Sequence, residues 1–565
     1  MDFRLTAAVL LWVTLLSLAL YSACQRKASS NERWWVLFGA FSLVLAIALP
    51  VWRWRSLVYN GEINVDESQI LAQALRYKLD PIPWRSVDGG SGGPLYTWAV
   101  FWAPLVGLKF NYLAARITGL ACYFLMCLAL GLTASRLVGR RLALLLTMPV
   151  VTLSLTAFNF DYVFFSSEQL PMALMAWACY LLTLQAPTPR AAPAYLLGFL
   201  TGALPFCKIQ AAPAGVILWL IGAGSLWVFR KSAVNLRNVI IAQVLGGLSV
   251  AVLILTPVIL QGAWGEFVTL YIKGGLGYQS SANTENVNPM SHLWMLVNAV
   301  PEFKAYYIAL LVLVSSGVLV GVAMALGKRK DHKPWIALLA AVLFTITIAF
   351  SIARSGYAFA HYTLLLLVPL TVLAGVFGLF VNSDVLEKPA FPNVALMSAA
   401  LLSVFFQGRQ VWQDYQKQPA LLGNWGNGIH PIGELIQKLT KPGDTILVWG
   451  YAPKFHVFSG VPPSYRVITT LPLLVDPDTS QESPAVTRYL ADLAKYPPAL
   501  IIDAPDEFWF PDPKVPKGSA ARHFLHPSTS SLVSKNYELM GQIDYPEGPP
   551  GMPKKLPIFI YRKKT

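Results

Sequence analysis

Long apolar segments separated by short polar ones run through most of this 565-residue chain, from about residue 5 to residue 406. An apolar stretch of about 20 residues is long enough to cross a bilayer as a helix. The pattern therefore predicts a polytopic helix bundle with twelve spans. The predicted spans are residues 5–24, 34–52, 112–134, 142–157, 168–185, 194–207, 211–229, 238–262, 305–326, 335–352, 362–381 and 392–406.

Two segments decide the parity of this count, and the first span needs a separate interpretation. Leu95–Lys109 is short and contains Pro104, so we expect an interfacial or re-entrant piece that does not cross. Residues 194–229 are expected to hold two spans with a tight turn at Lys208. The first span ends in Tyr21-Ser22-Ala23-Cys24, which is similar to a lipoprotein signal. Tyr21 is atypical there and Arg26-Lys27 follow directly, so we interpret residues 5–24 as a retained span.

The distribution of Lys and Arg predicts the orientation. With the N-terminus outside, the cytoplasmic loops (25–33, 135–141, 186–193, 230–237, 327–334 and 382–391) hold 15 basic residues in 50 positions. The external segments (53–111, 158–167, 207–210, 263–304 and 353–361) hold 10 in 124. This asymmetry follows the positive-inside rule. We therefore expect a multi-pass protein of the cell inner (plasma) membrane, with the 53–111 loop and the C-terminal region extracytoplasmic.

From about residue 407 the chain becomes polar and rich in proline. Its pattern predicts helices over 432–441 and 483–496, strands over 444–450, 499–503 and 558–562, and a loop over 546–553. Short apolar strands alternating with helices are typical of a small α/β domain. The predicted fold is thus mostly α, with a transmembrane domain over residues 1–406 and a soluble α/β domain over 407–565.

Composition narrows the function classes. The chain is 55% hydrophobic and 13% charged, with a formal net charge of +15. Its basic residues are scattered in short loops, which favours topology signals and contacts to lipid phosphates over nucleic-acid binding. The five cysteines lie within or beside predicted spans, so neither a disulfide framework nor a cysteine metal site is expected. They are Cys24, Cys122, Cys127, Cys179 and Cys207.

An acidic pair, Asp66-Glu67, opens an amphipathic segment in the first large external loop. Residues 70, 71, 74 and 75 are apolar and share one helical face. A helix lying along the outer membrane surface would hold Asp66 at its N-terminal end. Carboxylates beside a bilayer are costly unless they are paired or used, and a base at this place suits chemistry on a lipid-borne substrate. The same residues also fit a helix-capping Asp66 followed by a solvated Glu67.

Further polar residues are predicted at the same membrane face. Acids and cations gathered there are what a phosphate-bearing amphiphile and a proton acceptor require. The candidates are Glu62, Arg85, Asp88, the run Gly89–Tyr96, Arg116, Asp161, Glu168, Lys208, Arg354, His361 and Tyr362.

Each candidate also has an ordinary explanation. Arg116, Lys208 and Arg354 are also typical of cations that anchor spans at the head groups. Glu168 fits a helix cap, Asp161 fits the partner of a structural cation, and no metal ligand stands at a suitable spacing from His361. The run 89–93 lacks the Lys-Ser/Thr ending of a phosphate-binding loop, which favours a flexible loop.

The order of these motifs resembles the GT-C superfamily of integral-membrane glycosyltransferases, especially relatives of protein O-mannosyltransferases and lipid A aminoarabinose transferases. The resemblance covers residues 34–380. It rests on the acidic pair, Pro94-Leu95-Tyr96, the Glu168 loop, a Gly198…Gly202…Lys208 pattern and an Arg354…His361-Tyr362 loop. Residues 444–451 and 459–463 look like part of the soluble domain that many bacterial members carry.

The resemblance implies inverting transfer of a hexosyl or pentosyl group from a polyprenyl-phosphate carrier to a glycan, lipid or protein acceptor. It implies Asp66 as general base and Glu67 as a residue that orients sugar or acceptor. Family members often have His or Lys before Pro-Pro-Leu, where this chain has Gly92-Gly93-Pro94-Leu95. Arg116, Lys208 and Arg354 are therefore the candidates for contacts to the lipid phosphate, with Asp161, Glu168, His361, Tyr362 and Tyr96 as further substrate-binding residues.

No cofactor is required for this chemistry, although a divalent cation is compatible with it. Two other classes of function fit part of the pattern. A transporter or flippase for lipid-linked sugars would also have many spans, but the chain lacks paired halves with matching broken helices. A binding protein would use the α/β domain, where Trp449, Tyr451, Lys454, His456, Tyr465 and Arg466 are either glycan contacts or ordinary fold residues.

Overall fold

The computed structural model describes most of the chain, in twelve stretches. These are residues 3–25, 31–157, 159–185, 189–228, 236–277, 288–311, 333–354, 359–380, 431–470, 484–504, 527–547 and 554–564.

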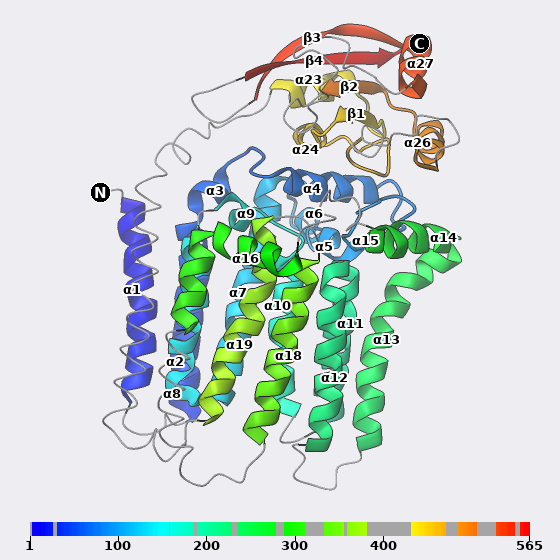
Figure 1. Ribbon diagram of the computed structural model, residues 1–565. Coiled ribbons are helices and arrows are strands. Elements are labelled where there is room, and N and C mark those ends of the chain that lie inside the picture. Colours follow the sequence, from blue (N-terminus) through cyan, green and yellow to red (C-terminus); the bar gives the residue numbers. More distant parts are fainter. Residues whose placement is uncertain are drawn as a thin grey trace.

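A bundle of long helices forms the larger part of the molecule, and the C-terminal region sits on one end of it (Figure 1). Among the described residues, seven helices are long and apolar enough to cross a membrane, which makes the chain a multi-pass membrane protein. The bundle contains α1 (Phe3–Cys24), α2 (Asn31–Trp52), α7 (Tyr112–Leu137), α8 (Gly139–Thr156), α10 (Gln169–Gln185), α11 (Ala191–Cys207), α12 (Ala212–Val228), α13 (Leu236–Leu260), α18 (Lys333–Ala353) and α19 (Leu367–Phe377).

These helices match ten of the predicted spans in place. α8, α10 and α11 are not among the seven, whereas α12 and α19 reach the required length together with the preceding 3-10 segments, as Ile209–Val228 and Ala360–Phe377. α8, α10 and α11 run beside the others (Figure 1). The turn predicted at Lys208 is present, because α11 ends at Cys207 and the 3-10 turn η1 (Ile209–Ala211) leads into α12. Most of span 305–326 and all of span 392–406 lie outside the described residues, so the total of twelve stays a prediction.

A layer of short elements covers the end of the bundle that faces the C-terminal region (Figure 1). Leu95–Lys109 contributes to two helices of five and four residues, too short to cross, which confirms that this segment is not a span. The layer contains α3 (Trp54–Val58), α4 (Val65–Tyr77), α5 (Pro94–Trp98), α6 (Trp102–Leu105), α9 (Phe160–Val163), α14 (Trp264–Glu266), the π-helical η2 (Phe267–Lys273), α15 (Gly274–Gly277), α16 (Pro289–Ala299) and the 3-10 segment η3 (Ala360–Leu366); the 3-10 turn η4 (Gly378–Phe380) ends α19.

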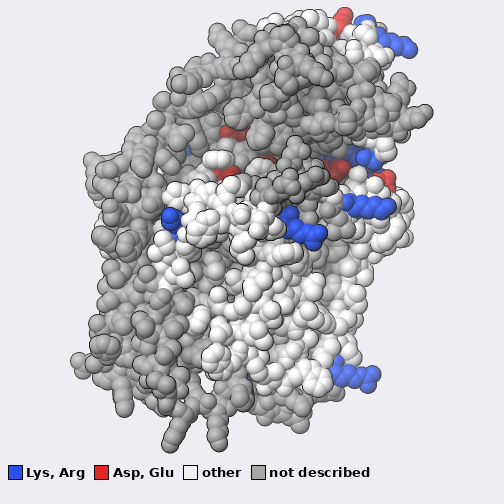
Figure 2. Space-filling view, in the orientation of Figure 1, with Lys and Arg blue, Asp and Glu red and all other residues white. Residues whose placement is uncertain are grey.

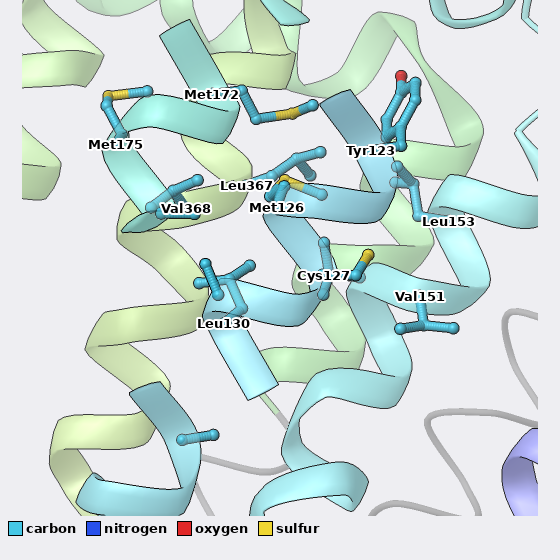
Figure 3. Packing of buried hydrophobic residues seen from close by; sticks show 14 of the residues in the cluster. Tyr123, Met126, Cys127, Leu130, Val151, Leu153, Met172, Met175, Leu367 and Val368 are labelled. Carbon is cyan, nitrogen blue, oxygen red and sulfur yellow. The ribbon is translucent and has the colours of Figure 1, made fainter. Parts of the chain in front are cut away.

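The largest apolar core lies where α7, α8, α10 and α19 meet (Figure 3). Tyr123 and Met126 of α7 are fully buried there, together with Met172 of α10 and Leu367 of α19. Charged side chains are sparse along the described face of the bundle and gather near its upper end, towards the C-terminal region (Figure 2). An apolar flank between polar ends is the surface that a bilayer requires.

α11 and α13 pack closely through glycines. A Cβ atom on Gly198 would lie 1.9 Å from the Gln243 carbonyl oxygen, and one on Gly246 would lie 2.0 Å from the Tyr195 carbonyl oxygen. Small residues let the backbones of membrane helices approach in this way. The contact fixes α11, whose C-terminal end carries Lys208.

We expect Gly198→Val to force α11 and α13 apart and to destabilise the protein by about 1–3 kcal/mol, the usual cost of overpacking. The measurement is the thermal unfolding midpoint of the purified protein in detergent. Gly224→Val in α12 is the matched control, because no atom lies within 4 Å of a Cβ placed there. Equal midpoints for the two variants would contradict the close packing.

The C-terminal region is a four-stranded sheet with helices on both faces. Strand order is β1-β2-β4-β3; β1 and β2 are parallel, and the other pairs are antiparallel. Ile446 and Ile502 face α23 and α24, whereas Leu447 and Ile501 face α26 and α27. The elements are α23 (Pro431–Leu439), β1 (Ile446–Gly450), α24 (Lys454–Ser459), α26 (Pro484–Lys495), β2 (Leu500–Ala504), α27 (Pro527–Asn536), β3 (Tyr537–Glu547) and β4 (Lys554–Lys563).

The predicted α/β domain is therefore present, with both predicted helices and all three predicted strands. The sequence pattern missed α24, α27 and β3, and β3 takes in the start of the expected 546–553 loop. The proposed domain boundary at residues 406 and 407 lies outside the described residues.

The α/β domain docks on the interfacial layer, mainly on α4. Gln69 donates a hydrogen bond to the Tyr451 hydroxyl (3.0 Å), and Arg76 donates one to the Pro463 carbonyl (2.8 Å). The buried Arg76 guanidinium also stacks over the Tyr496 ring at 4.0 Å. These contacts hold α4 between the bundle and the domain, with Asp66 at its first turn.

Candidate functional site

Asp66 lies in the first turn of α4, and Asn64 is the residue that caps the helix. The Asn64 side-chain oxygen accepts a hydrogen bond from the Asp66 backbone N–H at 2.9 Å. The alternative of a capping Asp66 followed by a solvated Glu67 is therefore wrong, because Glu67 is fully buried. The Asp66 carboxylate takes no part in capping the helix.

Glu67 and Arg116 form a buried, bidentate ion pair behind α4. Arg116 Nε and Nη2 lie 2.9 Å and 2.7 Å from the two Glu67 carboxylate oxygens. The remaining guanidinium N–H groups donate to the carbonyl oxygens of Ser56, Tyr59 and Gly61. Arg116 is buried and is neither a head-group anchor nor directed at an open site, which differs from the expectation that it contacts a lipid phosphate. It instead fixes the start of α4 against α7.

Asp161, from the short helix α9, connects three segments. One of its carboxylate oxygens accepts a hydrogen bond from the Asn64 side-chain amide (3.0 Å), and the other accepts one from the Ala360 backbone N–H (2.9 Å). A buried acid is stable only when its oxygens are satisfied in this way. Asp161 thereby brings α4 and η3 together at the bundle end.

Glu168 and Lys208 form a second buried ion pair. The Lys208 ammonium group donates to Glu168 Oε1 and to the Ser167 hydroxyl, the latter at 2.9 Å. It also lies 4.6 Å from the centre of the Tyr362 ring. Neither charge is solvated, so neither residue has the role of a simple helix cap or head-group anchor.

His361 lies where these groups converge. Its Nε2 is 3.9 Å from Asp66 Oδ2 and 3.8 Å from Glu168 Oε1, and its Nδ1 is 3.5 Å from Asp161 Oδ2. The imidazole is buried and stacks on the Phe359 ring with centroids 5.4 Å apart. Three carboxylates from three distant segments therefore surround one histidine, and Glu168 Oε1 is approached by both His361 and Lys208.

Exposure distinguishes the three acids. The Asp66 side chain is 40% exposed, whereas those of Asp161 and Glu168 are 6% and 0% exposed. Asp161 and Glu168 are also held by hydrogen bonds or an ion pair. Asp66 is thus the carboxylate of this cluster that a solute can reach.

The surroundings of Asp66 set its acidity. Desolvation by the enclosing protein raises the pKa of Asp66 above its ordinary value of 3.8, while His361 and Lys208 oppose this rise. Glu168 and Asp161 act in the same direction as desolvation. The effect of a helix N-terminus, which favours an ionised acid, is therefore outweighed, and the carboxylate is a stronger base than an exposed aspartate.

The glycine-rich run 89–93 is held against the Lys208 segment. Gly93 N–H donates to the Cys207 carbonyl and Ile209 N–H donates to the Ser91 carbonyl, both at 2.9 Å. A Cβ atom on Gly93 would lie 2.1 Å from the Phe206 carbonyl oxygen, so only glycine allows this approach. The run is therefore a fixed wall beside Lys208 and not the flexible loop that was the ordinary expectation.

Tyr96 is buried beside this wall, and its hydroxyl donates to the Gln73 side-chain oxygen at 2.7 Å. Because Gln73 lies on α4, Tyr96 braces α4 and does not point freely at a substrate. Tyr362 is also buried, under the Lys208 ammonium.

The remaining candidates lie around the cluster or away from it. Arg85 pairs with Asp80 at 2.7 Å; burial opposes ionisation of Asp80, but the Arg85 hydrogen bond outweighs it and lowers the pKa of Asp80. Asp88 receives a hydrogen bond from Gly90 N–H, although burial raises its pKa. Arg354 is exposed just after α18, and residues 355–358 that follow lie outside the described residues.

Several residues that the sequence did not single out support the site. Asn64 caps α4 and holds Asp161, Gln73 holds Tyr96, and the buried Arg53 donates to the Ser154 and Tyr162 carbonyls. The signal for Asn64 was present, because an Asn three residues before a Glu is a helix-start pattern. Nothing local marks the roles of Gln73 and Arg53.

Most of the aromatic and polar candidates in the α/β domain are fold residues. Trp449 and Tyr465 are buried in its core, and Arg466 pairs with Asp492 at 2.7 Å. His456 is buried and its Nδ1 lies 3.1 Å from the Val461 carbonyl; desolvation lowers the pKa of His456 to about 4. Lys454 is buried as well, and Tyr451 contacts Gln69 of α4. This arrangement favours a structural role for the set.

In the part of the chain that the structure describes, no three or more His, Cys, Asp or Glu residues are placed as ligands of one metal ion. The cluster around His361 is instead organised by ion pairs and by hydrogen bonds to backbone groups.

Comparison with known proteins gave matches among solved structures. No protein-family model matches the sequence, and no curated protein matches it. The chain is similar to the Archaeoglobus fulgidus oligosaccharyltransferase in complex with Zn and sulfate (13% identity, TM-score 0.43, covering 91% of this chain and 72% of that one). It is also similar to ArnT from Cupriavidus metallidurans in the apo state (13% identity, TM-score 0.38, covering 94% and 98%).

A third similar structure is AglB from Archaeoglobus fulgidus in complex with an inhibitory peptide and a dolichol-phosphate (12% identity, TM-score 0.43, covering 84% of this chain and 70% of that one). All three matches combine low sequence identity with a TM-score below 0.5.

Proposed function

We propose that this protein is a membrane glycosyltransferase that moves a sugar from a polyprenyl-phosphate carrier to an acceptor hydroxyl, with Asp66 as the general base. The single observation that carries the proposal is the state of Asp66. It is the reachable carboxylate in a cluster whose other acids are buried and bonded, and it lies at the end of a membrane bundle, where a lipid-borne substrate would meet it.

The proposed reaction is a single displacement. The acceptor oxygen attacks the anomeric carbon while its proton passes to the Asp66 carboxylate. The bond between the anomeric carbon and the phosphate oxygen breaks, and the carrier leaves with the electron pair as polyprenyl phosphate. Attack from the face opposite the leaving group inverts the anomeric centre.

The buried acids would support the sugar in this step. Glycosyl transfer passes through a transition state with positive charge on the sugar ring, and the charge of Asp161 and Glu168 favours such a species. His361 would hold Asp66 and both buried acids in fixed relation, as a positioning residue. Groups already oriented towards charge that develops in the transition state accelerate the reaction without reorganisation.

Contacts to the departing phosphate are proposed for Lys208 and Arg354. Lys208 provides a fixed positive charge within the cluster, and Arg354 is an exposed cation after α18. Arg116 would act through Glu67 by keeping the start of α4 in place. Glu67 is thus proposed as a positioning residue and not as a direct contact of sugar or acceptor.

We further propose that the site faces the extracytoplasmic side of the inner membrane, with its α/β domain. The positive-inside asymmetry supports this orientation. The polar cluster lies at one end of the bundle, beside the docked α/β domain, whereas substrate sites of transporters lie near the bilayer midplane. This position favours an enzyme over a flippase for lipid-linked sugars.

The test is incubation of the purified protein with a panel of hexosyl and pentosyl polyprenyl phosphates and with glycan, lipid and peptide acceptors. We expect release of free polyprenyl phosphate with at least one donor. The parallel arm follows movement of the same lipids across vesicles that contain the protein. Transbilayer movement without release from any donor would contradict the enzyme and establish the transporter.

The raised pKa of Asp66 predicts the acid limb of the rate profile. A general base must be ionised, so turnover should fall as the pH falls through a midpoint above 3.8. His361 lowers the pKa of Asp66, so His361→Gln should move this midpoint to higher pH. The measurement is single-turnover release of polyprenyl phosphate as a function of pH. A midpoint that moves down, or does not move, would contradict the coupling of the two residues.

A further inference from the structure

A cavity lies behind α4, on the side away from Asp66. It has a volume of about 570 Å³ and is lined by residues of α4, of the loop before α7, and of α23 and α24 in the α/β domain. Leu75 on its wall is nine residues after Asp66, or two and a half helical turns, so the two side chains leave opposite sides of α4. The cavity is therefore separate from the proposed catalytic cluster.

The cavity wall combines an apolar floor with charged groups at the rim. Leu75, Phe110 and Tyr112 are buried in the floor. The exposed Lys78 and Lys109 belong to the wall formed by α4 and the loop before α7, and the Lys78 ammonium lies 4.8 Å from the centre of the Phe110 ring. α7 begins at Tyr112 on the same wall, and its N-terminus is capped by Asn111, whose side-chain oxygen accepts a hydrogen bond from the Ala114 N–H at 3.0 Å.

The opposite rim, from the α/β domain, carries groups of another kind. Glu434 and Gln437 of α23 are exposed and line the cavity together with Gly460. The cavity thus offers two positive charges on one wall and a negative charge on the other. A ligand with a phosphate at one end and an ammonium group at the other matches this distribution.

Exposed apolar residues precede two parts of the cavity wall in the chain. Leu105 and Val106, shortly before Lys109, are 85% and 65% exposed. Trp54 and Val58 of α3, shortly before Asn60 on the cavity wall, are also exposed. Exposed apolar and Trp side chains at the end of a membrane bundle are typical of the boundary between acyl chains and head groups. The cavity therefore opens at head-group level.

We propose that this cavity binds the head group of a phospholipid of the phosphoethanolamine type. The phosphate pairs with Lys78 and Lys109, and the primary ammonium group pairs with Glu434 and donates to Gln437. The acyl chains leave over the Leu105–Val106 surface. Because the ligand touches both α4 and the α/β domain, its binding stabilises their docking. The inference is independent of the reaction proposed at Asp66.

The test is retention of defined lipids by the purified full-length protein, measured by native mass spectrometry from detergent. Phosphatidylethanolamine is compared with phosphatidylcholine, which keeps the phosphate but whose quaternary ammonium group cannot donate hydrogen bonds. We expect preferential retention of phosphatidylethanolamine. Lys78→Gln with Lys109→Gln should weaken its retention about tenfold or more, since charge-assisted hydrogen bonds are lost. Glu434→Gln should abolish the preference between the two lipids.

Lys273→Gln is the control, because Lys273 is an exposed cation of the same interfacial layer that does not line the cavity. All the replaced side chains are exposed, and equal unfolding midpoints without added lipid verify that the variants are folded. Retention that is unchanged in the double lysine variant, or equal for the two lipids in the wild type, would overturn the proposal. Equally tight binding of soluble O-phosphoethanolamine would also overturn it, because the site would then not be a lipid site.

Discussion

The Asp66→Asn protein should insert and fold normally but lose glycosyl transfer by about 10²–10⁴-fold, the usual contribution of a positioned general base. The Asp66 backbone N–H, which bonds to the Asn64 cap, is unchanged in this variant. The amide has the size of the carboxylate but cannot accept the acceptor proton at neutral pH. The loss should appear in kcat, because the proton is transferred in the chemical step.

The matched control is Glu32→Gln. It removes one carboxylate charge from an exposed position at the start of α2, outside the interfacial layer. We expect wild-type turnover for this variant. A loss for Asp66→Asn confined to KM, with kcat unchanged, would indicate that Asp66 binds substrate without taking a proton. Full activity of Asp66→Asn would show that Asp66 has neither a catalytic nor a substrate-binding role.

Lys208→Met should cause the second large effect, on stability. It leaves the fully buried Glu168 without its ammonium partner, and breaking a buried ion pair from one side costs about 3–5 kcal/mol. The expected result is a marked fall in the unfolding midpoint of the detergent-solubilised protein, together with loss of turnover.

The double variant Lys208→Met with Glu168→Gln separates pairing from catalysis. Removing both charges eliminates the unpaired buried carboxylate, so we expect much of the stability to return. Turnover should stay low if Lys208 also acts on the departing phosphate. Lys273→Met, at an exposed lysine, should leave both properties unchanged. A single Lys208 variant as stable as the wild type would contradict the buried pair.

Much of the architecture was predictable because it depends on local patterns. The apolar runs fixed the places of the bundle helices, and Pro104 with the short apolar run of 95–109 indicated the interfacial piece. The amphipathic pattern after Asp66 predicted α4. β3 escaped detection because it is an edge strand with a register shift at Gly541, and Leu539 and Met540 are exposed. An irregular edge strand lacks the alternation that marks a half-buried one.

The sequence indicated which residues belong to the candidate site, but not which of them contact one another. Asp66, Glu67 and Lys208 stood out as candidates because charged side chains near a membrane are costly unless they are paired or functional. The pairing of Glu67 with Arg116, and the gathering of three acids around His361, depend on contacts between segments far apart in the chain. Local sequence patterns do not predict such long-range contacts. Arg116 is the clearest example. Its sequence context is compatible both with a contact to a lipid phosphate and with a buried ion pair, and only the structure shows the ion pair.

The most direct test of Asp66 as general base is release of polyprenyl phosphate in a single turnover, with wild type and Asp66→Asn measured side by side at equal amounts of folded protein. We expect release and sugar transfer by the wild type, with an inverted anomeric centre in the product, and release that is slower by about 10² or more in the variant, the lower end of the effect of a general base. Equal rates of release by the two proteins would contradict this role of Asp66.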